Sequence, residues 1–134
     1  MKLSKKKQNF VKAQGVARLA TVSGDGIPHN VPVCPVWSDG HIFVASEKGA
    51  KKIKNLDSNP SATIVFDEYR DSWKGLRGVM LQCKTRTVDE KLFKKIRRKL
   101  YAKYPKYKTD SAIEASDSVI IELQPERTFS WGFK

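Results

Sequence analysis

Residues 17–60 restrict the possible folds of this chain more than any other segment. They read as three short apolar strands separated by two glycine-containing turns, and a lysine-rich helix follows the third strand. The turns at residues 23–26 (SGDG) and 38–40 (SDG) have the composition of β-hairpin turns. Strands joined by hairpins pair antiparallel. This segment therefore predicts an antiparallel meander that leads directly into a helix.

The hydrophobic pattern of the remaining chain predicts further strands and two more helices. Because Pro28, Pro32 and Pro35 have no N–H group, we expect part of the second strand at a sheet edge, a bulge or a gap. We expect helices over residues 3–14, 48–56 and 89–104, and strands over residues 16–22, 27–37, 41–46, 61–67, 76–88 and 118–123, with room for a last strand over residues 127–131.

The order of these elements favours a mainly β fold. The helices are too few and too clustered to cover both faces of a doubly wound parallel sheet. A small antiparallel barrel, closed or split, with helices at its periphery fits the order best. The length of 134 residues fits one domain, residues 1–134. We therefore expect an α+β protein of mainly β content, built as an antiparallel split β-barrel.

The chain is strongly basic, with a formal net charge of +12 from 26 basic and 14 acidic residues. Such a charge favours anionic partners: nucleic acid, an acidic membrane surface or phosphorylated small molecules. No apolar run approaches the about 20 residues needed to span a bilayer, so we expect no membrane partner. Polar Gln8 and Asn9 follow the basic N-terminus where a signal peptide would have an apolar core. We therefore expect a cytoplasmic protein.

The cysteines and histidines do not form a pattern typical of metal ligands. Cys34 and Cys83 are far apart and both lie in apolar, strand-like surroundings, so we expect two buried, reduced thiols. A zinc site needs more ligands than these two cysteines, His29 and His41 supply in any recognisable spacing. We therefore expect no metal site.

Lys51 and Lys52 are adjacent in the first half of the helix expected over residues 48–56. A phosphomonoester carries close to two negative charges near neutral pH and needs cationic donors. The free N–H groups and the positive end of the helix dipole add to the lysine charges at the start of a helix. The segment is compatible with a phosphate-binding site, and equally with an ordinary solvated basic face.

Nine short motifs follow one another along most of the chain. They are residues 20–22 (ATV), 26–28 (GIP), 31–36 (VPVCPV), 43–45 (FVA), 51–52 (KK), 55–56 (NL), 59–60 (NP), 76–79 (LRGV) and 130–131 (SW). In this order and spacing, the chain is similar to short members of the pyridoxamine 5′-phosphate oxidase-like family of FMN-binding split β-barrels. The resemblance extends from about residue 16 to residue 131.

The resemblance implies a homodimer that holds FMN at its interface and acts as a flavin-dependent oxidoreductase. The flavin would carry the redox chemistry, and no catalytic acid or base is assigned. His29, on the strand beside the flavin, is the nearest candidate, although a solvated or hydrogen-bonded strand histidine fits it better. The implied cofactor-binding residues are Val31, Pro32, Val33 and Cys34 along the flavin ring, Val44, Ala45 and Ser46 near the ribityl chain, Lys51 and Lys52 at the phosphate, and Arg77, Gly78 and Trp131 from the second subunit.

Three departures from the family pattern bear on the substrate. The true oxidases carry an arginine and a lysine where this chain has Val31 and Val36, and those cations help to bind flavin and substrate phosphate. The arginine-histidine substrate motif that follows the tryptophan in those enzymes is also missing after Trp131. We therefore expect that this protein does not oxidise pyridoxamine phosphate. The short relatives bind FMN, the deazaflavin F420 or haem, so F420 and haem remain alternative cofactors.

A nucleic-acid-binding module is the alternative of a different class. The helix expected over residues 89–104 and residues 105–108 are basic with interleaved tyrosines, which could track phosphates and stack bases. Tyr101 and Tyr104 fall on or near the apolar face of this helix, so packing explains them better. We therefore expect a small-molecule substrate and a second copy of the chain as partners, rather than nucleic acid.

Overall fold

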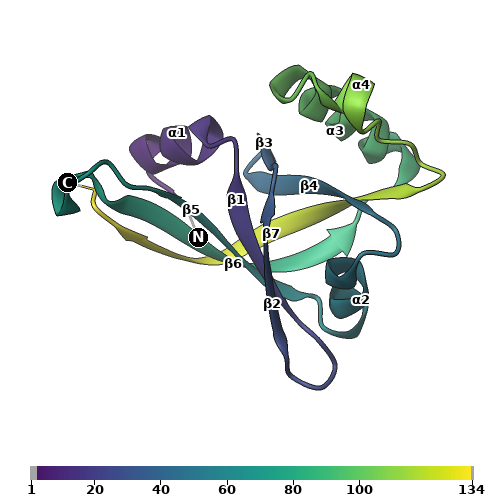
Figure 1. Ribbon diagram of the computed structural model, residues 1–134, viewed down its shortest axis with the longest axis horizontal. Helices are drawn as coiled ribbons and strands as arrows, with labels where there is room; N and C mark the ends of the chain where they lie inside the picture. The colour runs from purple at the N-terminus through teal and green to yellow at the C-terminus, as the bar shows by residue number, and fades with distance from the viewer. Residues whose placement is uncertain (1–2, 134) are drawn as a thin grey trace.

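A seven-stranded antiparallel sheet dominates the structure, a computed structural model that describes residues 3–133 (Figure 1). The elements are α1 (Lys5–Ala13), β1 (Ala17–Val22), β2 (Pro28–Val33), β3 (Val36–Ser38), β4 (His41–Glu47), α2 (Lys51–Ser58), β5 (Ser61–Glu68), the 3-10 helix η1 (Trp73–Gly75), β6 (Arg77–Thr87), α3 (Glu90–Lys103), α4 (Tyr107–Asp110) and β7 (Ser118–Trp131). No helix within the described residues is long and apolar enough to cross a membrane.

The strand order explains the shape of the sheet. The strands lie in the order β2-β1-β5-β6-β7-β4-β3, so β2 and β3 form opposite edges although they follow each other in the chain. Only Cys34 and Pro35 join them. From Val33 to Val36 the chain can reach at most about 11 Å. The sheet must therefore curl until its two edges meet, which gives the antiparallel split barrel expected from the sequence.

The single strand expected over residues 27–37 is wrong, because the structure divides it into β2 and β3. Pro35 has no N–H group to donate to a ladder, and at this point the chain crosses from one sheet edge to the other. The expectation that the prolines lie at an edge or gap is confirmed. Pro28 and Pro32 lie on the edge strand β2, where β1 is the one pairing partner among the described residues.

The last part of the chain forms one strand where the sequence suggested two. β7 runs without interruption over 14 residues and pairs with β4 through its first half and with β6 through most of its length. Pro125 interrupts the apolar pattern of this strand, but the register with β6 shifts between Gln82 and Cys83 opposite it. Such a bulge accommodates a residue that cannot donate to the ladder.

Two groups of buried apolar side chains hold the helices to the sheet. The first fills the inside of the curl and includes Phe10 and Val11 of α1 and Ile53 of α2. The second attaches α3 to β3, β4 and β7; its buried members are Val36, Phe43, Phe93, Ile96, Leu100, Ile113 and Ile120.

The helix ends follow local capping chemistry. The Ser4 hydroxyl accepts a hydrogen bond from Lys7 N–H at the start of α1, and Asp89 caps α3 by accepting from Leu92 N–H. The second helix begins at Lys51, three residues later than predicted, because residues 48–50 form the turn after β4. The sequence pattern did not indicate α4 or η1, since each contains a single turn.

Side chains at the end of α3 form hydrogen bonds to the link between the two sheet edges, Cys34 and Pro35. Lys103 Nζ donates to the carbonyl oxygens of Gln14 (2.7 Å) and Pro35 (2.9 Å). The Tyr104 hydroxyl lies 2.6 Å from the Pro35 oxygen and 3.0 Å from the Gly15 oxygen. Burial lowers the pKa of Lys103 and raises the pKa of Tyr104. Two side chains of one helix thus tie the chain before β1 to the link before β3.

Replacing Tyr104 by phenylalanine should lower the free energy of unfolding by about 1 kcal/mol, because the Pro35 carbonyl loses a donor in a partly buried place. Urea denaturation measures this change. Tyr69→Phe is the matched control, since Tyr69 is 59% exposed and its ring contacts only Trp73 among the described aromatic residues. Equal stability of the two variants would contradict the role assigned to Tyr104.

Candidate functional site

A cavity of about 270 Å³ lies where β4 ends and α2 begins. Ala45 and Ser46 of β4 and Lys52 of α2 line one part of it. Tyr107 of α4 and Ser111, just after α4, line another part. The structure therefore brings together three of the residues that the family resemblance implies for the ribityl chain and phosphate. Tyr107 and Ser111 come from a segment outside the family motifs. The remaining lining residues are Glu47, Ala50, Ala112, Ile113 and Ser118.

The first turn of α2 is open toward a ligand. Ala50 is the N-cap residue and makes no side-chain hydrogen bond to the helix, because alanine has no polar group to offer. The first N–H groups of a helix have no partner within the helix. Together with the positive end of the helix dipole, they form a preferred place for an anion. Ala50 and Lys52 both border the cavity, so this end of the helix belongs to its wall.

Lys51 and Lys52 differ in their position relative to the cavity. Lys52 is half-buried and lines the cavity, whereas Lys51 is exposed and does not. Successive residues of a helix point about 100° apart, so two adjacent side chains cannot face one small cavity equally. Lys51 instead lies near the β1–β2 turn, where the Ser23 hydroxyl lowers the pKa of Asp25 and Lys51 adds a smaller electrostatic contribution.

Tyr107 connects the cavity to the link between β2 and β3. Burial raises the pKa of Tyr107 to about 12, and a hydrogen bond to Cys34 adds to this rise. The ring of Tyr107 also packs edge-on against Tyr104, with ring centres 5.8 Å apart. Cys34 therefore lies beside the cavity, and it is half-buried rather than buried as predicted. The prediction of a buried thiol is confirmed for Cys83, whose pKa burial raises to about 12.

The remaining residues expected along the flavin are held mainly by the core. Val44 is fully buried, Val33 is 7% exposed, and Val31 packs against the same core. Pro32 points outward and is exposed. Any contact of β2 with a ligand would thus come from its backbone groups, which remain available on the edge that faces away from β1.

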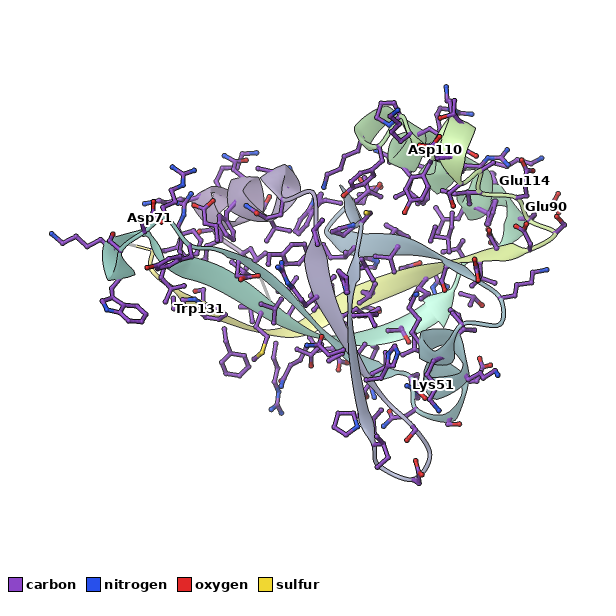
Figure 2. The ribbon with its side chains drawn as sticks, in the orientation of Figure 1. Lys51, Asp71, Glu90, Asp110, Glu114 and Trp131 are labelled. Atoms are coloured by element: carbon purple, nitrogen blue, oxygen red, sulfur yellow. The ribbon has the colours of Figure 1, made fainter. Side chains whose placement is uncertain are left out.

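Arg77, Gly78 and Trp131 lie at the other end of the sheet, well away from Lys51 (Figure 2). Gly78 pairs with Trp131, and a Cβ atom at position 78 would collide with the tryptophan ring. Arg77 is already engaged within its own chain: Nε donates to Glu68 at 2.7 Å, and the guanidinium lies 4.9 Å from the centre of the Phe10 ring. One copy of the chain therefore cannot bring Trp131 to the cavity beside Lys52.

The two histidines have different surroundings. His41 Nδ1 lies 2.6 Å from the buried carboxylate of Glu122, which also accepts from Arg86. His29 Nδ1 is buried and has no hydrogen-bond partner within residues 3–133. Among the same residues, no three His, Cys, Asp or Glu side chains are grouped so that they could hold a metal ion.

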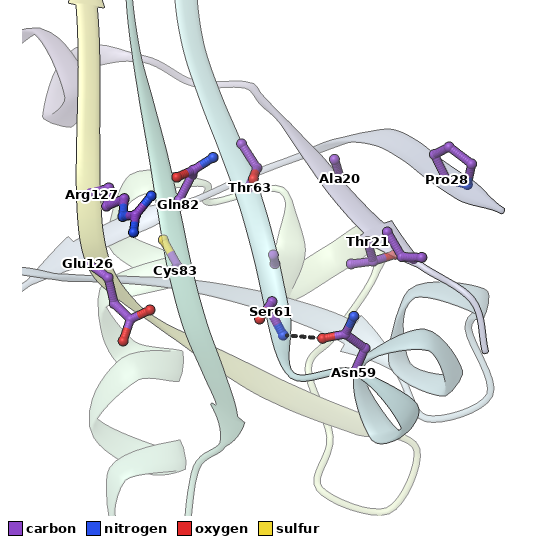
Figure 3. A pocket seen from close by; sticks show the side chains of 12 residues that line it. Ala20, Thr21, Pro28, Asn59, Ser61, Thr63, Gln82, Cys83, Glu126 and Arg127 are labelled. Atoms are coloured by element: carbon purple, nitrogen blue, oxygen red, sulfur yellow. Dashed lines mark hydrogen bonds between the residues drawn. The ribbon is translucent and has the colours of Figure 1, made fainter. Parts of the chain in front are cut away.

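A second depression, of about 380 Å³, lies on the sheet next to the bulge at Glu126 of β7 (Figure 3). Glu126 and Arg127 border it with opposite charges, and the Asn59 side chain at its rim accepts from Ser61 N–H at 3.1 Å. None of the twelve residues that the family resemblance implies lines this depression. It offers no excess of cationic donors, so the cavity beside Lys52 is the better candidate for an anionic cofactor.

Sequence reasoning missed Tyr107 and Ser111. A single helical turn has no measurable periodicity, and the basic residues around Tyr107 suggested contacts with nucleic acid rather than a cofactor cavity. The contact between this segment and α2 depends on how α3 packs on the sheet, which a local pattern does not encode.

The chain matches a known protein family over almost its whole length. Residues 3–132 match the protein-family model described as pyridoxamine 5′-phosphate oxidase. No curated protein sequence matches the chain.

Several solved structures share the fold. The haem storage protein HutZ from Vibrio cholerae is 21% identical, with 96% of this chain and 94% of that chain covered and a TM-score of 0.80. An FAD-binding protein from Mesorhizobium loti is 22% identical, with 96% and 94% covered and a TM-score of 0.73. An F420 reductase is 18% identical, with 95% and 98% covered and a TM-score of 0.77. At these identities the likeness establishes the fold alone.

Gly78→Ala should lower the free energy of unfolding by about 1–3 kcal/mol, because the new methyl group would overlap the Trp131 ring. Gly24→Ala is the matched control, since a Cβ atom there meets nothing within 4 Å. Adding Trp131→Ala to Gly78→Ala should recover part of the loss, as coupled neighbours do. Urea denaturation of the four proteins measures these differences, and equal effects at positions 78 and 24 would contradict the overlap.

Proposed function

This chain belongs to the pyridoxamine 5′-phosphate oxidase-like family of split barrels, and on that premise we propose that it binds FMN and acts as a flavin-dependent oxidoreductase. The observation that carries the proposal is the cavity between β4 and α2. It combines a cationic side chain, Lys52, with the uncapped N-terminus of a helix. These are the groups that a phosphomonoester requires.

The residues around the cavity fit the phosphate end of FMN. Lys52 offers an ammonium group and Ser111 offers a hydroxyl group. The Tyr107 hydroxyl is hydrogen-bonded to Cys34, and Glu47 also lines the cavity. Ser46 donates its hydroxyl hydrogen to the Glu47 carbonyl at 3.0 Å, so its oxygen can still accept from a ribityl hydroxyl. FMN supplies the redox chemistry when bound. The role of the chain is to anchor the phosphate and to orient the ring along the edge of β2.

The substrate is proposed to differ from pyridoxamine phosphate. Val31 packs against the core and Val36 is 8% exposed beneath α3, so neither position supplies a cation to a second phosphate. Removing an unpaired phosphate from water without a cationic partner would be costly. An uncharged or weakly charged substrate fits this strand better.

A second copy of the chain would complete the site. The outward face of the sheet carries Phe129 (48% exposed) and Trp131 (39% exposed), and Trp73 (84% exposed) lies beside the start of β6. Large apolar side chains that gather on one exposed face favour an interface. Because Trp131 is remote from Lys52 within one chain, a homodimer is the arrangement in which Trp131 of one copy could contact a flavin held by the other.

Haem is the second candidate, and His29 is the observation that favours it. Its Nδ1 atom makes no hydrogen bond among the described residues, and a histidine nitrogen is a group that could hold haem iron. The haem storage protein and the F420 reductase both share this fold. The visible absorption spectrum of the protein from its native host separates the candidates, because flavin, deazaflavin and haem absorb differently and the mass of the extracted cofactor identifies it.

Lys52→Ala should weaken FMN binding roughly 10- to 150-fold, since a charge-assisted hydrogen bond contributes about 1.5–3 kcal/mol. Lys51→Ala should have a smaller effect, because Lys51 does not line the cavity. Fluorescence titration of FMN with the stripped protein measures both. Lys54→Ala, on an exposed side of the same helix, is the control and should leave the affinity unchanged. Equal affinities of the Lys52 and Lys54 variants would remove the phosphate assignment.

Phe129→Asp should convert the homodimer into monomers and abolish FMN binding, because a charge on the apolar face would be buried without a partner. Light scattering after gel filtration gives the mass of each species. Ile27→Asp introduces the same charge at a side chain that is 62% exposed near the β1–β2 turn, and should leave the dimer intact. A monomeric parent protein, or a dimer that survives Phe129→Asp, would contradict this interface.

A further inference from the structure

The basic charge of the chain is concentrated on one element. Residues 90–108, which include α3 and the beginning of α4, contain nine Lys or Arg residues and one acidic residue, Glu90. This segment therefore carries eight of the twelve net positive charges. None of its residues except Tyr107 lines the candidate cofactor cavity.

The cations of α3 share one side of the helix. Its opposite side is buried through Phe93, Ile96 and Leu100, which fixes the orientation of the helix on the sheet. Residues separated by three, four or seven positions lie on the same side of a helix. The exposed basic face consists of Lys91, Lys94, Lys95, Arg98 and Lys99.

Most of this basic face has no strong partner in the chain. Lys94 is 4.0 Å from Glu90 and Lys95 is 3.4 Å from Asp39, and all four side chains are at least half exposed. Such surface ion pairs contribute little to the stability of the fold, and salt screens them readily. Within residues 3–133, no ion pair involves Lys91, Arg98 or Lys99. Five positive charges are therefore held close together on a rigid helix. An extended anion bound along the helix would reduce the repulsion between them.

The aromatic residues beside the basic face are not free to stack on bases. The Tyr101 hydroxyl accepts from Ile113 N–H at 2.9 Å, and Lys108 Nζ lies 5.7 Å from the centre of its ring. Tyr104 is held by its hydrogen bonds to the β2–β3 link. This confirms that the tyrosines serve packing, as the sequence indicated. The tyrosines are therefore not available to stack on bases, whereas the cations can still bind phosphates.

The same face is poorly suited to a membrane. A helix that lies in a membrane interface must insert its apolar side, and the apolar side of α3 is already buried against β3, β4 and β7. No large exposed hydrophobic residue lies on α3. A nucleic-acid duplex presents phosphates at fixed, regular positions. It therefore matches the rigid row of cations on α3 better than a membrane does.

We propose that the basic face of α3 binds the phosphate backbone of a nucleic-acid duplex, at a surface separate from the cofactor cavity. Contacts of this kind carry no base specificity by themselves. If about four phosphates are neutralised, a fourfold rise in salt concentration weakens binding by roughly 100-fold.

The test is fluorescence anisotropy of a short random-sequence DNA duplex titrated with the full-length protein at two salt concentrations. The variant Lys91→Glu/Arg98→Glu/Lys99→Glu reverses three charges that make no ion pair in the described structure, and should lose at least 100-fold in affinity. The control Lys5→Glu/Lys54→Glu/Lys74→Glu makes the same change in net charge on other exposed residues, and should lose far less. Cofactor content and thermal stability of each protein show that the fold is retained.

Binding of the duplex that falls steeply with salt and is lost only in the α3 variant supports the proposal. Equal losses in the two triple variants would overturn it, since net charge alone would then explain the binding. Binding to vesicles of anionic lipid but not to the duplex would also overturn it and assign the basic face to a membrane. Tighter binding of a single strand than of the duplex would overturn the choice of duplex.

Discussion

The curvature of the sheet follows from the two residues that connect its opposite edges. Cys34 and Pro35 must join β2 to β3, and no flat arrangement of seven strands could satisfy so short a connection. The inner core, the orientation of α3 and the position of the candidate site all depend on this connection.

The candidate site shows how such a fold can assemble a binding place from ordinary parts. β4 is buried along most of its length and ends where the chain turns into α2, so the start of the helix is fixed relative to the sheet. A cap residue at Ala50 would stabilise the helix, and its absence leaves the N–H groups available. Local stability is lower at this point, and the capacity to hold an anion is correspondingly greater.

Local patterns predicted those features that depend on local chemistry. The hairpin turns follow from residue types and spacing, and the prolines correctly indicated an edge or a gap. The break at Pro35 could not be located because a proline in a run of valines is compatible with an edge strand, a bulge or a gap. Only the pairing of β3 with β4 decides among them.

The site was predicted in part for the same reason. Ala45, Ser46 and Lys52 meet because consecutive elements place them together, so a family pattern along the chain is enough to identify them. The separate orientations of Lys51 and Lys52 depend on where α2 begins, and the first turn of a helix is hard to locate from composition. Tyr107 reaches the cavity only through the packing of α3, a contact that no pattern in neighbouring residues records.

The hydrogen bonds that Lys103 and Tyr104 make to the β2–β3 link indicate the order in which the barrel folds. Lys103 and Gln14 are 89 positions apart, whereas the β1–β2, β3–β4 and β5–β6 pairs each join neighbours in the chain. Bringing distant residues together costs loop entropy that local hairpins avoid. We therefore expect the hairpins to form first and the two edges to meet last. By the same reasoning, the amide hydrogens around Cys34, where the two sheet edges meet, should exchange with solvent before those of the other strands.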